Sequence, residues 1–300
     1  LINTRREMQF HKKDNLNVEH INAGPAIYIV STPIGNLDDL TYRAHNVLKS
    51  VDGILAENPR HSSRLLSHYG IVTPMRQYHD HNEKKITEKI INEVIEKDLV
   101  VALISDAGTP LISDPGYTLI QQASLRHIPV FPVPGACALI TALSISDLPT
   151  NRFVFEGFLP SNEGARKSRL DGLLKEERTV VFYEAPHRIL ALLDSIADVL
   201  GSYRSVVVAR ELTKLYESIY RGTVSDAKKH LVSHPEVVRG EFVVVLGGTK
   251  TSTSDTELEE VLRVLLASVD LKLATELCCK LTGSKRNLVY KLAIGLREKN

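Results

Sequence analysis

An unbroken apolar run extends from Leu99 to Ile104 and ends in a loop rich in Gly, Pro, Ser and Asp. A strand that is apolar on both faces is typical of a parallel sheet covered by helices on both sides. A second apolar run, Ala26 to Val30, also ends in a turn-forming loop, and a segment with helical periodicity follows it. This alternation of strands and helices predicts an α/β protein with a parallel sheet.

The alternation continues through both halves of the chain, with a polar, proline-containing segment at 147–151 between them. Strands are expected at 26–30, 53–56, 99–104, 129–133, 153–157, 179–183, 205–209 and 241–246, with 217–222 as an additional edge strand. Helices are expected at 40–48, 62–68, 83–96, 116–127, 168–175, 187–200 and 224–233. The second half therefore predicts another α/β domain, with a mixed sheet.

The two ends of the chain differ from this pattern. Residues 1–25 are polar, lack periodicity and contain no apolar core of a secretory signal, so we expect a disordered lead outside the fold. A Thr/Ser-rich hinge at 249–256 precedes helices at 258–267 and 273–281, and Ser284 is expected to cap a third. This tail is similar to a helix-turn-helix and suits either a nucleic-acid contact or a helical cap or dimer element.

These boundaries predict four parts, which are a lead at 1–25, α/β domains at 26–148 and 149–248, and a hinge with a helical extension at 249–300.

Composition excludes several classes of protein. The net charge of +1 is too low for a protein that grips RNA by overall charge, so any such contact needs local patches. The three cysteines show no metal or disulfide spacing, which fits a reduced, cytoplasmic compartment. No apolar run approaches the roughly 20 residues needed to cross a bilayer, and no metal site is expected. Neither a dinucleotide nor a phosphate-loop fingerprint occurs.

Three unusual loops follow predicted strands, at 31–36, 105–116 and 132–136. Ligands of open α/β sheets bind beyond the carboxyl ends of the strands. Gly and Pro let a backbone approach a ligand closely, and free N–H groups at such turns bind carboxylates. Charged clusters at 57–61, 184–188 and 210–214 also follow strands. Each feature alone fits a tight turn, a helix cap or an ion pair, but together they indicate a polar ligand cleft.

In this order, the motifs resemble the tetrapyrrole-methylase superfamily and, within it, the ribosomal RNA small-subunit methyltransferase I (RsmI) group. The matching segments are 31–39, 106–110, 113–117, 132–135, 182–188, 210–214 and 240–242, and the resemblance runs from about Ala26 to the end. It implies two α/β domains of the class III methyltransferase type, with S-adenosylmethionine between them and a helical extension. It also implies a cytoplasmic homodimer that methylates the 2′-hydroxyl of a cytidine in 16S rRNA of the small ribosomal subunit, in its decoding region.

The loops and the resemblance together give two sets of candidate residues. The expected cofactor contacts are Pro33, Asp106, Gly108, Thr109, Pro110, Asp114, Pro134 and Gly135. The expected catalytic residues are Glu57, Arg60, His61, Glu184, Arg188, Glu211 and Lys214. The carboxylates and the histidine are candidate bases for a ribose hydroxyl, and the cations would hold phosphates or lower the pKa of that hydroxyl. The sequence does not rank the bases.

One position departs from the family pattern. Between Glu57 and Arg60 the family usually has an acidic residue and a threonine, whereas this chain has Asn58 and Pro59. Loss of the carboxylate would weaken substrate positioning or catalysis, and Pro59 suits the first position of a helix. Two alternative functions stay open, which are a tetrapyrrole C-methyltransferase with the same fold and cofactor, and a non-catalytic RNA-binding protein of ribosome assembly.

Overall fold

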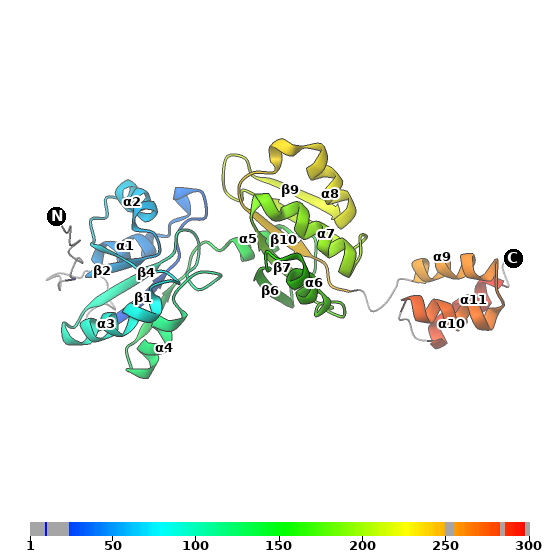
Figure 1. Ribbon diagram of the computed structural model, residues 1–300, viewed down its shortest axis with the longest axis horizontal. Helices are drawn as coiled ribbons and strands as arrows, with labels where there is room; N and C mark the ends of the chain where they lie inside the picture. Colours follow the sequence, from blue (N-terminus) through cyan, green and yellow to red (C-terminus); the bar gives the residue numbers. More distant parts are fainter. Residues whose placement is uncertain (1–9, 11–23, 250–254, 283–285, 298–300) are drawn as a thin grey trace.

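The computed structural model describes residue 10 and residues 24–249, 255–282 and 286–297. Two five-stranded sheets, each with its own helices, follow one another along the chain, and a unit of helices forms its C-terminal part (Figure 1). The predicted α/β fold class is therefore confirmed. Among the described residues, no helix is long and apolar enough to cross a membrane.

The first sheet is entirely parallel, as predicted. Its order is β3 (Met75–Gln77), β2 (Gly53–Ala56), β4 (Val100–Ile104), β1 (Ala26–Val30) and β5 (Val130–Val133). Every residue of the apolar strand β4 is buried, because β4 lies in the middle of the sheet. Parallel strands end at the same edge, so the loops after β1, β2, β4 and β5 meet there.

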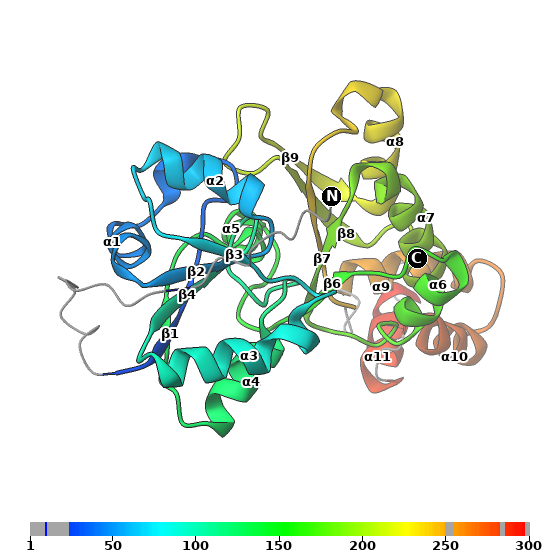
Figure 2. The same cartoon turned by 60° about the vertical axis from the view of Figure 1, so that its left-hand side comes forward.

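Helices cover both faces of this sheet (Figure 2). The helices α1 (Tyr42–Ser50) and α2 (Pro59–His68) share one apolar cluster with the strands, and α3 (Glu83–Glu96) and α4 (Tyr117–Leu125) share another. The helix α3 has the predicted bounds, since its apolar residues recur at helical spacing between a polar start and a polar end.

Phe10 is an exception to the expectation that residues 1–25 stay outside the fold. Its side chain is 1% exposed and packs in the cluster between the first sheet and α3. The Arg76 guanidinium lies 4.3 Å from its ring centroid. A Cβ atom at Gly53 would lie 2.5 Å from the ring, so the glycine leaves room for the aromatic side chain. Residues 1–9 and 11–23 of the expected lead lie outside the described residues.

The second sheet is mixed, with the order β6 (Phe153–Phe158), β7 (Thr179–Glu184), β10 (Phe242–Leu246), β8 (Ser205–Arg210) and β9 (Ser218–Thr223). The strand β6 runs parallel to β7, whereas β10 is antiparallel to both of its neighbours. The predicted mixed sheet is confirmed, and so is the predicted edge strand, which is β9. The last strand along the chain thus occupies the centre of this sheet.

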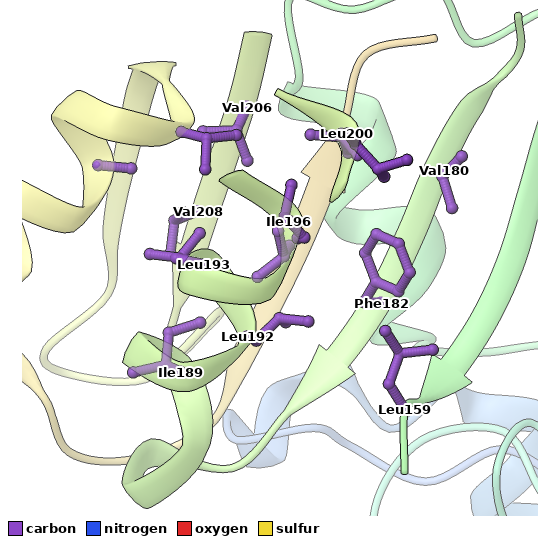
Figure 3. Close-up of a cluster of buried hydrophobic side chains, with 14 of the residues drawn as sticks. Leu159, Val180, Phe182, Ile189, Leu192, Leu193, Ile196, Leu200, Val206 and Val208 are labelled. Carbon is purple, nitrogen blue, oxygen red and sulfur yellow. The ribbon is translucent and has the colours of Figure 1, made fainter. Parts of the chain in front are cut away.

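One face of the second sheet packs against α6 (Glu163–Asp171), α7 (Ile189–Leu200) and α8 (Val224–Ser233). Leu192, Leu193 and Ile196 of α7 point toward side chains of the strands (Figure 3). Burial of each stabilises the fold by about 2 kcal/mol. The helix α6 begins at Glu163 rather than at the predicted Ser168, because the Asn162 side chain accepts a hydrogen bond from the third backbone N–H after it.

The opposite face of the second sheet is covered by α5 (Ala138–Ile145), which follows directly after the last strand of the first sheet. Leu139, Ala142 and Leu143 of α5 are buried in one cluster with residues of β7, β8 and β10. The chain therefore reaches the second sheet before the predicted linker at 147–151.

The C-terminal unit consists of α9 (Asp255–Leu266), α10 (Leu271–Thr282) and α11 (Arg286–Arg297), which pack around an apolar cluster of their own. The three predicted helices are present, with bounds that differ by a few residues. The predicted cap Ser284 and residues 250–254 of the predicted hinge lie outside the described residues.

Candidate active site

The loops after β1, β4 and β5 are joined to one another by hydrogen bonds. The backbone N–H of Thr32 donates to the Gly108 carbonyl at 2.8 Å, and that of Gly108 donates to the Thr32 carbonyl at 3.0 Å. The Thr109 hydroxyl lies 2.9 Å from the Ser31 hydroxyl and donates to the Ala136 carbonyl at 3.0 Å. The three loops that the sequence singled out thus form one unit at the carboxyl edge of the first sheet.

The loop after β4 holds several residues in left-handed backbone conformations. Gly108 has φ +81° and Gly116 has φ +134°, and Leu111 and Ser113 adopt φ of 72° and 68° although they carry side chains. Such non-glycine residues cost about 1–3 kcal/mol each and cluster at functional sites. A Cβ atom at Gly116 would lie 2.6 Å from Leu103, so a side chain there would also collide with β4.

The antiparallel direction of β10 brings three chain segments of the second sheet together. Phe242, the first residue of β10, pairs with Glu184 at the end of β7 and with Arg210 at the end of β8. Glu184 is 2% exposed, and its carboxylate forms an ion pair at 3.0 Å with Arg188. Burial raises the pKa of Glu184, and the Arg188 charge acts in the opposite direction.

The loop after β8 carries a second group of charges. The Lys214 ammonium lies 2.8 Å from the Glu211 carboxylate and 2.9 Å from that of Glu241. Burial acts to lower the pKa of Lys214, but its bonds to the two carboxylates raise it overall. For Glu211, burial acts to raise the pKa, but the bond to Lys214 lowers it overall. Lys214 is thus already neutralised by the protein's own carboxylates.

The loops of the two sheets touch at Gly35. The Asn36 N–H donates to the Thr213 hydroxyl at 3.2 Å. A Cβ atom at Gly35 would lie 2.3 Å from Cγ of Lys214, so only glycine allows this approach. Contact between the two loops brings the carboxyl edges of both sheets together around a shared site.

A cavity of about 380 Å³, which we call the acidic cavity, lies between these loops. Its polar lining contains Glu57, Asp106, Asp114, Glu184 and Glu241, and residues 107–109 also line it. Its apolar lining contains Ile34, Ile112, Phe158, Tyr183, Phe242 and Val243. The volume and the mixture of apolar walls with a few polar groups are typical of a small-molecule site.

Negative charge is in excess in the acidic cavity. Burial raises the pKa of Asp114 to about 7, and the nearby carboxylates of Glu57, Asp106 and Asp80 act in the same direction. Burial also raises the pKa of Glu57, although its carboxylate accepts a hydrogen bond from the Asp106 N–H at 3.3 Å. Such a site favours a ligand with positive charge. No group of His, Cys, Asp or Glu suited to a metal ion occurs among the described residues.

An adjoining cavity, also of about 380 Å³, is lined by α2 and is called the α2 cavity below. Its lining consists of Pro33, Ile34, Gly35, Leu37, His61, Ser62, Arg64, Leu65, Ser105, Asp106, Ala107, Lys214 and Glu241. Four of these residues, Ile34, Asp106, Ala107 and Glu241, also line the acidic cavity. The two cavities therefore share a wall.

The candidate residues from the sequence fall into three groups by position. Glu57, Asp106, Gly108, Thr109, Asp114 and Glu184 line the acidic cavity. Pro33, His61, Asp106 and Lys214 line the α2 cavity. Arg60, Pro110, Pro134, Gly135, Arg188 and Glu211 line neither cavity. In the third group, Arg188 and Glu211 hold lining residues by ion pairs, and a Cβ atom at Gly135 would lie 2.9 Å from Ser31. The functional roles of all of them stay predictions.

Several lining residues were not singled out from the sequence. Tyr183 is one, and its hydroxyl accepts a hydrogen bond from the Leu139 N–H at 2.9 Å, which joins β7 to α5. Ser62 and Arg64 of α2 are two others. Helical spacing could have indicated Arg64, because it lies three positions after His61 and four after Arg60 and shares a face with them. No such spacing indicates Ser62.

Asn58, the departure from the family pattern, caps α2. Its side-chain oxygen accepts hydrogen bonds from the N–H groups of Arg60 at 3.2 Å and His61 at 3.4 Å. Pro59 is the first residue of α2, which confirms the helix start expected there. The Asn58 N–H donates to the Asp106 carboxylate at 3.1 Å, so this position keeps a link to the acidic cavity without a carboxylate of its own.

Two families match the chain. The Tetrapyrrole (Corrin/Porphyrin) Methylases match residues 26–228, and the RsmI C-terminal HTH domain matches residues 252–297. Ribosomal RNA small subunit methyltransferase I of Pseudomonas aeruginosa is 45% identical over 272 residues, which cover 89% of this chain and 96% of the relative. The protein of that name from a Synechocystis strain is 43% identical and covers 90% of this chain and 98% of the relative. The chain belongs to the ribosomal RNA small subunit methyltransferase I family.

Solved structures with the same fold lie further from this family member in sequence. Uroporphyrin-III C-methyl transferase from Thermus thermophilus, solved in complex with S-adenyl homocysteine, has a TM-score of 0.52 at 19% identity, with 74% of this chain and 97% of that chain covered. A diphthine synthase has a TM-score of 0.57 at 11% identity, with 75% and 90% covered. These likenesses establish the tetrapyrrole-methylase fold, as the motifs predicted.

Proposed function

We propose that this protein transfers a methyl group from S-adenosylmethionine to a cytidine 2′-hydroxyl of 16S rRNA in the small ribosomal subunit. The single observation that carries this proposal is the acidic cavity at the joined carboxyl edges of the two sheets, in a chain of this family. The relatives are named as ribosomal RNA small subunit methyltransferases, and their lengths are covered almost completely.

The residues of the acidic cavity suit S-adenosylmethionine. This molecule carries a sulfonium, an ammonium and a single carboxylate, so its net charge is positive. Asp114 keeps a pKa of about 7 because burial and neighbouring carboxylates oppose its ionisation, and a bound cation would relieve that repulsion. The backbone of Ala107 and Thr109, on either side of the paired Gly108, offers polar groups to a carboxylate or an amine, while Tyr183 and Phe242 give apolar walls for an adenine.

Glu57 is the carboxylate best suited to act as the base. The cofactor, when bound, supplies an electrophilic methyl group for attack by the ribose oxygen. Glu184 and Glu211 are already held by Arg188 and Lys214, whereas Glu57 lines the cavity and forms no ion pair with another described residue. Burial raises the pKa of Glu57, which strengthens it as a proton acceptor near neutral pH.

The test begins with calorimetric titration of the protein with S-adenosylmethionine. Methyl transfer to small ribosomal subunits from a strain that lacks the modification follows in the same sample. Binding with transfer to a ribose supports the proposal. Binding without transfer to RNA would favour a different acceptor, such as a tetrapyrrole, and absence of binding would favour a non-catalytic RNA-binding protein. Sedimentation at the same concentration tests the homodimer that the family resemblance implies.

The assignment of Glu57 predicts that Glu57→Gln lowers kcat about 100-fold, because general bases contribute roughly that much or more. The affinity for S-adenosylmethionine should change far less. Glu96→Gln, at an exposed position of α3, is the matched control and should leave kcat unchanged. A Glu57→Gln protein with wild-type kcat would contradict the assignment.

A further inference from the structure

The α2 cavity contains a buried polar atom that has no partner. Ser62 is 3% exposed, and its hydroxyl has no hydrogen-bond partner among the described residues. Buried polar groups are almost always satisfied, so an orphaned hydroxyl in a cavity wall indicates a ligand that completes it.

The lining of the same cavity includes a cation that no described carboxylate balances. Arg64 is exposed and forms no ion pair within the described part of the chain. Lys214, which also lines this cavity, is neutralised by Glu211 and Glu241. Arg64 is therefore the positive group of this cavity that is available to an anion, and a guanidinium binds phosphate oxygens with two parallel hydrogen bonds.

The two cavities differ in charge, so they favour different ligands. The acidic cavity presents five carboxyl side chains, which repel a phosphodiester. The α2 cavity combines Arg64 with apolar walls from Leu37 and Leu65. Its two carboxyl side chains, Asp106 and Glu241, belong to the wall that it shares with the acidic cavity. A nucleotide whose phosphate lies on Arg64 and whose ribose faces the shared wall would thus keep the phosphate away from Glu57, Asp114 and Glu184, which line the acidic cavity alone.

We propose that the α2 cavity binds the acceptor nucleotide, with Arg64 on the phosphate next to the acceptor ribose and the Ser62 hydroxyl bonded to the nucleotide. Both are positioning residues. The proposal rests on the proposed function, because it names where the RNA acceptor of that reaction lies.

The test compares Arg64→Gln, Arg64→Lys and Ser62→Ala with the wild-type protein, using unmodified small ribosomal subunits and S-adenosylmethionine. Arg64→Gln should raise KM for the subunits about tenfold, since a hydrogen bond to a charged group is lost, while kcat changes little. It should also reduce the slope of log affinity against log salt by about 0.7, as expected for one lost phosphate contact. Arg64→Lys should restore part of the loss.

Ser62→Ala separates a binding role from a structural one. Removal of an unsatisfied buried hydroxyl should raise Tm, because the free protein no longer buries that group without a partner. The same variant should raise KM for the subunits about threefold. A merely structural serine would not give a more stable protein that binds its acceptor more weakly.

Arg126→Gln, at the exposed end of α4, is the control for the change in charge and should behave as wild type. Loss of S-adenosylmethionine affinity in Arg64→Gln and Ser62→Ala would overturn the inference, because the cavity would then belong to the cofactor. Variants that match the wild type in KM and salt slope would also overturn it. Methyl transfer by the wild-type protein is measured before any variant is compared. If the wild type transfers no methyl group to RNA, the proposed function itself fails.

Discussion

The two sheets contribute to the site in different ways. In the first sheet all strands run in one direction, and the loops after β1, β4 and β5 are joined mainly through backbone groups such as those of Thr32 and Gly108. In the second sheet β10 runs against its neighbours, and the ends of the strands are held by ion pairs such as Arg188 with Glu184. The first sheet thus gives the site its shape, and the second gives it balanced charge.

This difference predicts separable effects of mutation. Changes in the first-sheet loops should weaken ligand binding more than they weaken the fold. Changes in the second-sheet ion pairs should weaken the fold, because a buried charge without its partner is costly. The predictions below test that separation, beginning with the largest effect.

The largest effect is expected for the ion pair between Arg188 and Glu184 in the second sheet. Arg188→Ala leaves the buried Glu184 carboxylate without its partner, so the free energy of unfolding should fall by about 3 kcal/mol. Urea denaturation measures this change. Lys229→Ala is the control, because its pair with Asp226 is exposed and should contribute less than about 1 kcal/mol. Equal losses in the free energy of unfolding would contradict the prediction that the buried pair contributes more than the exposed one.

A glycine in the first-sheet loops should show the opposite pattern, in which ligand affinity falls more than stability. Gly108→Val places a branched side chain at φ +81° with Ile34 at 3.2 Å, so the cross-bonded loops must shift. Affinity for S-adenosylmethionine should fall about 100-fold, as for other displaced binding groups. Gly201→Val is matched in backbone strain, with φ +105°, and has no neighbour within 4 Å of the new Cβ atom. Gly201→Val should lower Tm without changing the affinity for S-adenosylmethionine. A loss of affinity as large as that of Gly108→Val would contradict the difference proposed between the two sheets.

The excess negative charge predicts a pH dependence of cofactor binding. Asp114 has a pKa of about 7 in the free protein, and a bound cation should favour its ionised form. Protons are then released on binding, so affinity should rise with pH through about 7, by roughly tenfold between pH 6 and 8. Asp114→Asn should flatten this rise. Calorimetry in buffers of different ionisation enthalpy counts the released protons, and proton uptake would contradict the prediction.

The smallest effect is expected for Lys214→Gln. The Lys214 ammonium is about one quarter exposed on its side chain and pairs with Glu211 and Glu241, so its loss should cost about 1 kcal/mol of stability at neutral pH. The pKa of Glu211 lies below its usual value in the folded protein, so this contribution is lost as pH falls through that lowered pKa. The two proteins should therefore become equally stable in acid. A difference that persists at low pH would indicate lost packing rather than lost charge.

Periodic segments with clear ends could be predicted from the sequence. The strand β4 and the helices α3 and α8 were expected at or near their observed bounds because apolar spacing and polar flanks agree there. The strand β3 was missed, since Met75 to Gln77 is too short to show alternation. The helix α6 was placed too late because its cap, Asn162, precedes a stretch with few apolar residues.

Contacts between distant segments could not be predicted. The loops that carry the candidate ligand-binding residues were identified because each follows a strand, but nothing local indicates that Gly35 touches Lys214. Likewise, Ser62 follows the pattern of any helix, and only its burial without a partner marks it. Side-chain pairing across long sequence separations depends on the packing of whole elements, which periodicity does not encode.

The central position of β10 has a consequence for synthesis on the ribosome. Domains fold as their segments emerge, and the first sheet has all its strands by residue 133. The second sheet lacks its middle strand until residues 242–246 have left the exit tunnel, and Glu241 and Phe242 of the site arrive with it. Until then β7 and β8 expose unpaired edges to solvent. A nascent chain that stalls before this strand therefore has neither a finished second sheet nor a complete acidic cavity, and it is vulnerable to aggregation and proteolysis.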